Sequence, residues 1–224
     1  MAELWTTLLP LAIGSALIPI EIALTIVLLR GPGGVRKALA WVGGMTVVRL
    51  VQLVVLGSVI RVAVDDGEQG TSIAEGAVLL VVGVLFLVVA ARKATNQPDE
   101  DAPPPGWMTI LDGASIGRAF VMGAGLIAVN PKLWAFTIAA IGAIGDAQLD
   151  GPASMAAFLV FVIVAQSVHL TAIAVTALAP DRAKVVLDSL NAWLERYSRT
   201  LLIGLSVVFG VWLLLLALES FGIL

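Results

Sequence analysis

Cysteine is absent from this chain of 224 residues, and only one histidine is present. Disulfides, thiolate metal sites and thiol redox chemistry are therefore excluded, and a metal site built from several histidines cannot form within one chain. Charge is also scarce, because only 13% of the residues are charged against about 25% in a typical soluble domain. Together with 59% hydrophobic residues, this composition predicts a polytopic membrane protein.

Catalytic signatures are missing as well. Segment 31–37, Gly-Pro-Gly-Gly-Val-Arg-Lys, lacks the glycine spacing and the following Ser or Thr of a phosphate-binding loop. No GxSxG or HExxH motif occurs, and no intramembrane pair of carboxylates stands out. We therefore expect neither an enzyme nor an ATP-driven pump in this chain alone, and we expect no cofactor and no nucleic acid partner.

Six apolar stretches are long enough to cross a bilayer, which takes about 20 residues each. They cover residues 4–29, 38–60, 73–91, 118–145, 153–179 and 200–221. The N-terminus lacks the positive region of a signal peptide, so we expect the first stretch to be retained. Segment 93–117 contains a polar, proline-rich run and indicates a flexible linker between two halves, 1–92 and 118–224, of one membrane domain spanning 1–224.

Basic residues predict the orientation of the chain in the inner (plasma) membrane. Ten lysines and arginines fall in alternate loops, whereas only Arg61 falls on the opposite side. By the positive-inside rule, both termini should lie outside the cytoplasm and the linker inside it. Within segment 181–199, apolar residues recur at helical spacing, which predicts an amphipathic helix on the cytoplasmic surface. This helix is either a lead-in to the sixth span or a docking element; its apolar positions are Val186, Leu190, Trp193, Leu194 and Tyr197.

Two spans are interrupted by proline. The fourth contains Asn130, Pro131 and Lys132, and the first contains Pro19 and Glu21. These are corresponding members of two three-span halves, and halves with an odd number of spans must lie in opposite orientations. The pattern predicts six transmembrane helices arranged as two inverted three-helix repeats, typical of secondary transporters with a site near the midplane. We expect the two breaks to face one another there.

The second span of each half carries a polar pair at helical spacing, Arg49 with Gln52 and Gln166 with His169. Charged side chains inside a membrane usually mark pathways or binding sites. Lys132 and Arg49 are candidates to receive an anionic or hydroxyl-rich head group, while Lys132 could instead be a structural group. For Glu21 the alternatives are a proton-coupling residue, a counter-ion and a solvated vestibule group. His169 is either a hydrogen-bonded structural partner of Gln166 or a proton relay.

The six spans, Ile18-Pro19-Ile20, the basic first loop and Asn130-Pro131-Lys132-Leu133-Trp134 resemble the lysine-exporter (LysE) superfamily. Within it, the chain is most similar to the actinobacterial glycopeptidolipid- and sulfolipid-addressing proteins. This resemblance implies an integral inner-membrane protein that helps to move cell-envelope glycolipids toward the surface. It supports functional roles for Pro19, Asn130, Pro131 and Lys132, whereas Glu21, Arg49 and His169 are candidates on physical grounds alone.

Three functions are therefore weighed. The leading hypothesis is an exporter of envelope glycolipids or their precursors, without an ATPase of its own. The second is an exporter of a small polar solute such as an amino acid or cation. The third is a non-transporting scaffold for a larger lipid-export machine. Membrane lipids, such a cargo, this machinery and a second copy of the chain are the expected partners.

Overall fold

The computed structural model describes residues 2–65, 68–95 and 114–223, and within these ranges it contains helices and no strand. The predicted all-helical fold is thus confirmed for the described part of the chain. Most of the predicted linker 93–117 lies outside the described residues. The helices are α1 (Ala2–Ala16), α2 (Pro19–Arg30), α3 (Gly34–Asp65), α4 (Glu68–Thr95), α6 (Ile116–Val129), α7 (Pro131–Asp146), α8 (Gly151–Ala165), α9 (Ser167–Leu178) and α10 (Pro180–Ser220).

Both predicted proline breaks occur. The first predicted span consists of α1 and α2, which meet at a bend of 51°, and α2 begins at Pro19. Proline is well tolerated in the first turn of a helix, because the N–H that it lacks would have no helical partner there. The fourth predicted span consists of α6 and α7, which meet at 70° with Asn130 between them and Pro131 opening α7.

A third break occurs where the sequence predicts continuous helix. The fifth predicted span, 153–179, is divided into α8 and α9, which meet at 61°. Gln166 lies at the junction with φ −105° and ψ 5°, outside helical geometry. Its amide group is hydrogen-bonded to Thr46 of α3. This break therefore coincides with a tertiary contact and not with a proline, so the local sequence does not indicate it.

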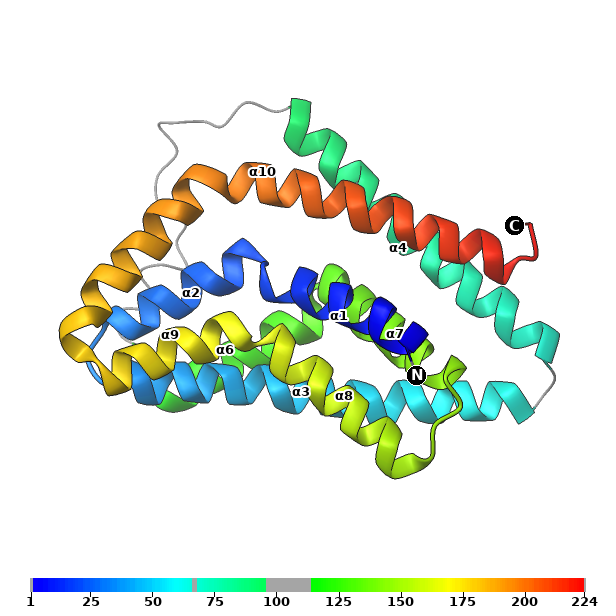
Figure 1. Cartoon of the computed structure of the whole chain (residues 1–224), viewed down its shortest axis with the longest axis horizontal. Helices are drawn as coiled ribbons and strands as arrows, with labels where there is room; N and C mark the ends of the chain where they lie inside the picture. Colours follow the sequence, from blue (N-terminus) through cyan, green and yellow to red (C-terminus); the bar gives the residue numbers. More distant parts are fainter. Residues whose placement is uncertain (1, 66–67, 96–113, 224) are drawn as a thin grey trace.

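Segments 181–199 and 200–221, predicted as a surface helix and a span, belong to the single helix α10. No proline or glycine stands between them to end the helix. Arg30 at the end of α2 pairs with Asp188 of α10 at 2.6 Å, and Arg199 donates to backbone carbonyls near the end of α4. These contacts hold α10 as it curves past α2 and then runs along α4 (Figure 1). Val186 and Tyr197 of the predicted apolar face are exposed.

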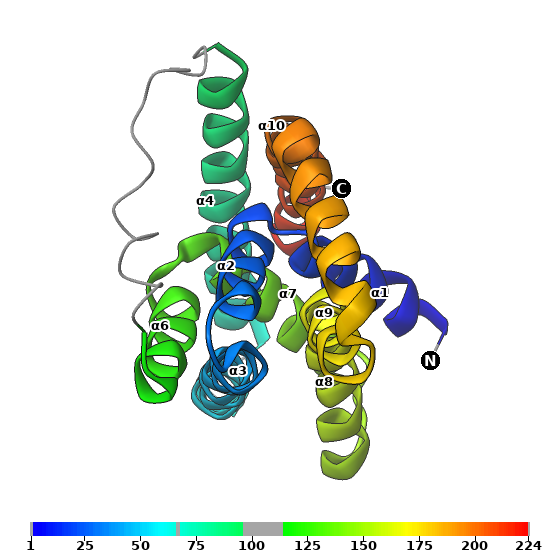
Figure 2. The ribbon, with the colours of Figure 1, turned by 90° about the vertical axis from the view of Figure 1, so that its left-hand side faces the viewer.

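Glycines bring two pairs of helices into close contact. Gly44 and Gly123 lie where α3 packs along α6, and a side chain at either position would collide with the backbone of the other helix. Gly83 and Gly210 lie where α4 packs along α10, and a Cβ on either would be 3.0–3.1 Å from the carbonyl oxygen of the other. Figure 2 shows both helix pairs. Gly204 of α10, in contrast, faces open space.

The chain termini and the connections between helices lie at one or the other end of the helix bundle. Both chain ends, the C-terminal end of α3 and the α7–α8 loop lie at one end, and the α2–α3 and α9–α10 junctions lie at the other (Figure 1). Among the described residues, two helices have the length and composition of membrane spans, and up to five candidates result if each bent pair is one span. Helix α4 covers the predicted stretch 73–91.

Candidate functional site

The middle of α3 directs an arginine into the interior of the bundle. Arg49 is 1% exposed, although it carries a guanidinium group. Its Nη2 donates to the hydroxyl of Ser15 on α1 at 2.9 Å, and its Cζ lies 5.8 Å from the ring centre of Phe161 on α8. Three helices therefore position the cation, and Ser15 lies close to the bend between α1 and α2.

A second cluster of polar side chains lies between α2 and α9. Nε2 of His169 is 3.4 Å from Oε2 of Glu21, and its Nδ1 is 3.0 Å from the hydroxyl of Thr25. Exposure is 1% or less for each of the three residues. The 3.4 Å contact is an ion-pair distance without hydrogen-bond geometry, so the Glu21 carboxylate has no hydrogen-bond donor. This carboxylate also attracts the Arg49 guanidinium through Coulombic interaction.

A hydrogen bond between α3 and the α8–α9 junction completes the polar region. Nε2 of Gln166 donates to the hydroxyl of Thr46 at 2.9 Å. Thr46 in turn donates to the carbonyl of Val42, one turn earlier in α3, at 2.8 Å. Thr46 precedes Arg49 by three residues, so both side chains lie on the same side of α3. The bend in the fifth predicted span is therefore tied to the helix that carries Arg49.

Several polar atoms of this region are buried without a hydrogen-bond partner among the residues that the structure describes. They are Nε and Nη1 of Arg49, both amide atoms of Gln52, both carboxylate oxygens of Glu21 and Nε2 of His169. Buried polar groups in proteins are nearly always paired, since each unpaired group costs about 1–3 kcal/mol. A concentration of such atoms, including a cation and an anion, makes this region the candidate polar site of the described part of the chain.

The break at Asn130 lies between α6 and α7, and nearby residues donate hydrogen bonds to the backbone carbonyls beside it. The carbonyl of Asn130 accepts from the backbone N–H groups of Leu133 and Trp134. The indole N–H of Trp134 donates to the carbonyl of Ala128 at 2.9 Å, so this tryptophan caps the end of α6. The side chains of Pro131 and Lys132 lie outside the described residues, and the proposed role of Lys132 stays a prediction.

Sequence reasoning found part of this region. Arg49, Gln52 and Glu21 are buried together with Gln166 and His169, as their positions within apolar spans indicated. Gln166 and His169, however, do not form the helix-face pair that their spacing suggested, because the helix breaks at Gln166 and the two side chains contact different helices. Pro19 is buried at the start of α2.

Four further residues were missed, namely Ser15, Thr25, Thr46 and Phe161. Two of them carried a usable signal, since Thr25 follows Glu21 by one helical turn and Thr46 precedes Arg49 by one. Ser15 and Phe161 come from distant parts of the sequence and carried none. Small hydroxyl residues are common in membrane helices, so only a three-dimensional contact distinguishes these four from packing residues.

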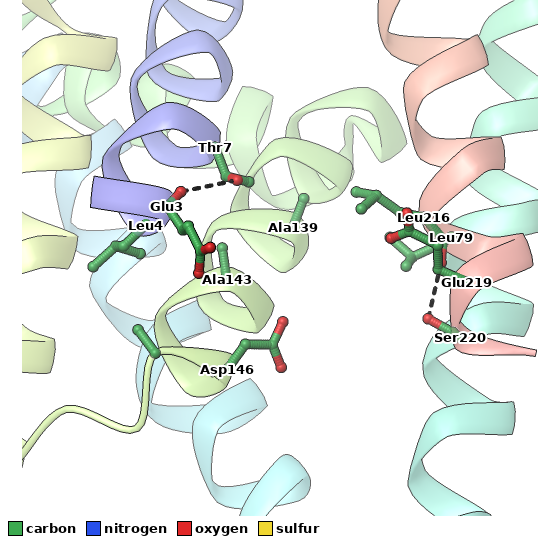
Figure 3. A pocket seen from close by; sticks show the side chains of 11 residues that line it. Glu3, Leu4, Thr7, Leu79, Ala139, Ala143, Asp146, Leu216, Glu219 and Ser220 are labelled. Atoms are coloured by element: carbon green, nitrogen blue, oxygen red, sulfur yellow. Dashed lines mark hydrogen bonds between the residues drawn. The ribbon is translucent and has the colours of Figure 1, made fainter. Parts of the chain in front are cut away.

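A separate pocket of about 320 Å³ lies between α1, α4, α7 and α10, at the end of the bundle that holds both chain ends. Three carboxylates, Glu3, Asp146 and Glu219, line it together with apolar side chains (Figure 3). The described residues contain no group of three or more acidic, histidine or cysteine side chains that could hold a metal ion. None of the residues predicted for the functional site lines this pocket.

Long apolar helices, two of whose three breaks lie beside a buried polar cluster, define an all-helical membrane protein. The sequence profile of the family described as Sap, sulfolipid-1-addressing protein, matches residues 8–219. Since the match covers nearly the whole chain, the protein belongs to this family, and the predicted resemblance to the sulfolipid-addressing proteins is confirmed. Searches of curated proteins and of solved structures gave no significant match.

Proposed function

We propose that this protein is an exporter that moves an anionic envelope lipid, or its precursor, across the inner membrane without an ATPase of its own. The observation that carries this proposal is Arg49, a fully buried cation with unpaired N–H groups beside a break in the first span. Burying an unpaired charge in a membrane protein is costly and is retained mainly where it serves function. The family description names a sulfolipid, whose sulfate would suit a guanidinium.

The roles of the other residues follow from their positions. Arg49 and Gln52 offer N–H donors to the head group, while the bends near Pro19, Asn130–Pro131 and Gln166 supply hinges for opening and closing. Lys132 follows directly on a break, and we assign it to a second contact with the anion. Glu21 and His169 are assigned to coupling.

Helix packing supports the proposal of two inverted repeats. In such a repeat, α1, α2, α3 and α4 correspond in turn to α6, α7, the α8–α9 pair and α10. When each helix is exchanged for its counterpart, the contact between α3 and α6 becomes the contact between α8 and α1, and both contacts are present. The contact of α2 with α10 likewise becomes that of α7 with α4, and the α4–α10 contact maps onto itself. Such correspondence is expected of a six-span transporter of the lysine-exporter type with both termini outside the cytoplasm.

A second candidate function is export of a small cation or amine. The observation that favours it is the pocket with Glu3, Asp146 and Glu219, because three carboxylates attract cations to that end of the bundle. A lipid head group with negative charge would be repelled there. The two functions therefore place the cargo in different parts of the molecule.

The lipid proposal is tested by comparing surface lipids of cells that lack this protein with cells that express it. Wild-type protein should restore the anionic surface lipid, and Arg49→Gln should not. Arg30→Gln is a matched control, since it removes one arginine from an exposed pair with Asp188. If Arg49→Gln restored the lipid as well as Arg30→Gln did, at equal protein levels, the proposed role of Arg49 would be wrong. If exported cations changed instead, the second function would replace the first.

A further inference from the structure

The hydrogen bonds around His169 fix where its protons lie. The hydroxyl of Thr25 is 2.9 Å from the carbonyl oxygen of Glu21, one turn earlier in α2, and 3.0 Å from Nδ1 of His169. A carbonyl oxygen only accepts, so the single hydroxyl proton of Thr25 is directed to it. Other threonines of this bundle, Thr46 and Thr176, donate to the carbonyl one turn back in the same way. In this arrangement the oxygen of Thr25 is the acceptor for a proton on Nδ1 of His169.

The opposite side of the ring requires a further proton. With Nδ1 protonated, a neutral imidazole has a lone pair on Nε2, and this nitrogen lies 3.4 Å from Oε2 of Glu21. Two buried atoms that both carry lone pairs repel one another at this distance, and no donor from the described part of the chain reaches either atom. A proton between them removes this repulsion, either as imidazolium with carboxylate or as neutral imidazole with carboxylic acid.

We propose that Glu21 and His169 form a binding site for one exchangeable proton, and that this proton controls whether Arg49 can bind an anion. With the proton, the Glu21–His169 pair is neutral overall and the Arg49 charge is uncompensated. Without it, the pair carries one negative charge that compensates Arg49 from nearby. The second part of this inference rests on the proposed function of Arg49 as an anion site, whereas the first part rests on geometry alone.

Among the described residues, the charged groups on the helices packed against α2 and α9 do not take the place of Glu21 and His169 as the proton site. The charged residue of α3 that interacts with Glu21 is Arg49, and the interaction is Coulombic attraction. From α10, Asp188 pairs with Arg30 at the exposed end of α2. Helices α1 and α8 contribute Ser15 and Phe161 near Arg49, and neither side chain titrates. The Lys132 side chain of α7 lies outside the described residues.

The single histidine of the chain makes the proton positions directly measurable. Full-length protein without a histidine tag, labelled with ¹⁵N in the histidine ring, gives one pair of ring-nitrogen NMR signals in lipid bilayers. At neutral pH, Nδ1 should be protonated. An unprotonated Nδ1 at neutral pH would mean that Thr25 donates to the ring, and it would overturn the proton site.

Two substitutions of Thr25 provide a matched control. Thr25→Ser keeps the hydroxyl and should keep the protonated Nδ1. Thr25→Val removes the acceptor and should move the neutral ring to the tautomer that is protonated at Nε2. If both variants gave the same tautomer as wild type, Thr25 would not fix the ring and the derivation would be wrong.

The link to Arg49 is tested separately, with dioctanoyl phosphatidylglycerol as the anionic probe and dioctanoyl phosphatidylcholine as its zwitterionic counterpart. Loss of the proton at high pH should weaken binding of the anionic probe alone, by about 5–150-fold if the coupling is of ordinary size. Glu21→Gln should abolish this pH dependence. An anionic affinity that did not change with pH in wild type would refute the link while leaving the NMR result intact. Failure of lipid export in cells, with both results as expected, would instead refute the proposed function.

Discussion

Replacing Arg49 by methionine should abolish lipid export without unfolding the protein. Arg49 makes one hydrogen bond, to Ser15 at 2.9 Å, and one cation–π contact, with Phe161 at 5.8 Å. A hydrogen bond to a charged group contributes about 1.5–3 kcal/mol and a cation–π contact about 0.5–2 kcal/mol. The two buried donors without a partner, Nε and Nη1, each cost about 1–3 kcal/mol.

The favourable contacts total about 2–5 kcal/mol and the two unpaired donors cost about 2–6 kcal/mol, so the central values of these ranges nearly cancel and the expected net contribution of the Arg49 polar groups to stability is close to zero. Methionine fills most of the same volume and removes the unpaired donors. Replacing a whole buried ion pair by apolar side chains is often neutral or stabilising by about 1–4 kcal/mol, and Arg49 forms no direct ion pair with Glu21 among the described contacts. We therefore expect the free energy of unfolding of Arg49→Met to be unchanged or higher than that of wild type.

The assay compares unfolding in detergent micelles, followed by tryptophan fluorescence, with lipid export by the same variant in cells. Ser15→Ala is the control for loss of the hydrogen bond alone, and it should lower stability by about 0.5–1.5 kcal/mol. A loss of about 3–5 kcal/mol in Arg49→Met would be the signature of a broken structural charge pair. That result would refute the reasoning, because Arg49 would then be retained for folding and not for binding.

Three further predictions concern the helices that hold the site. A double-mutant cycle of Gln166→Leu with Thr46→Val should give a coupling energy of about 0.6 kcal/mol and at most about 1.7, as for other interhelical hydrogen bonds in membranes; zero coupling would contradict the bond. Gly210→Val should lower the free energy of unfolding by about 1–3 kcal/mol through overpacking against α4. Gly204→Val, which faces open space, should not, and equal losses would contradict the packing. Trp134→Phe should cost about 0.5–1.5 kcal/mol by removing the donor that caps α6, as measured by thermal unfolding.

The sequence was a reliable guide wherever the cause of a structural feature is local. Pro19 and Pro131 end hydrogen-bonded helix by their own chemistry, so both breaks could be predicted to within a residue. Arg49 and Glu21 could be identified as unusual because charge is costly among apolar residues. Apolar stretches of span length gave the all-helical fold, and the family was indicated by resemblance, in part through Asn130-Pro131-Lys132.

The features that the sequence did not reveal arise from contacts between distant segments. The bend at Gln166 accompanies a hydrogen bond to Thr46, 120 residues earlier in the chain. The pairing of Glu21 with His169 joins the first and fifth predicted spans, and periodicity within one helix cannot indicate it. The continuity of α10 was missed for a different reason, because a change from amphipathic to apolar composition does not end a helix.

The most direct test of the central claim is the movement of a fluorescent anionic lipid in liposomes that contain the purified protein. A quencher added outside should reach lipid from the inner leaflet faster with wild-type protein than in protein-free liposomes, and Arg49→Gln should bring the rate back to the protein-free value. Arg30→Gln should behave like wild type. Equal rates for wild type, Arg49→Gln and protein-free liposomes would contradict the account and identify the chain as a scaffold that moves no lipid by itself.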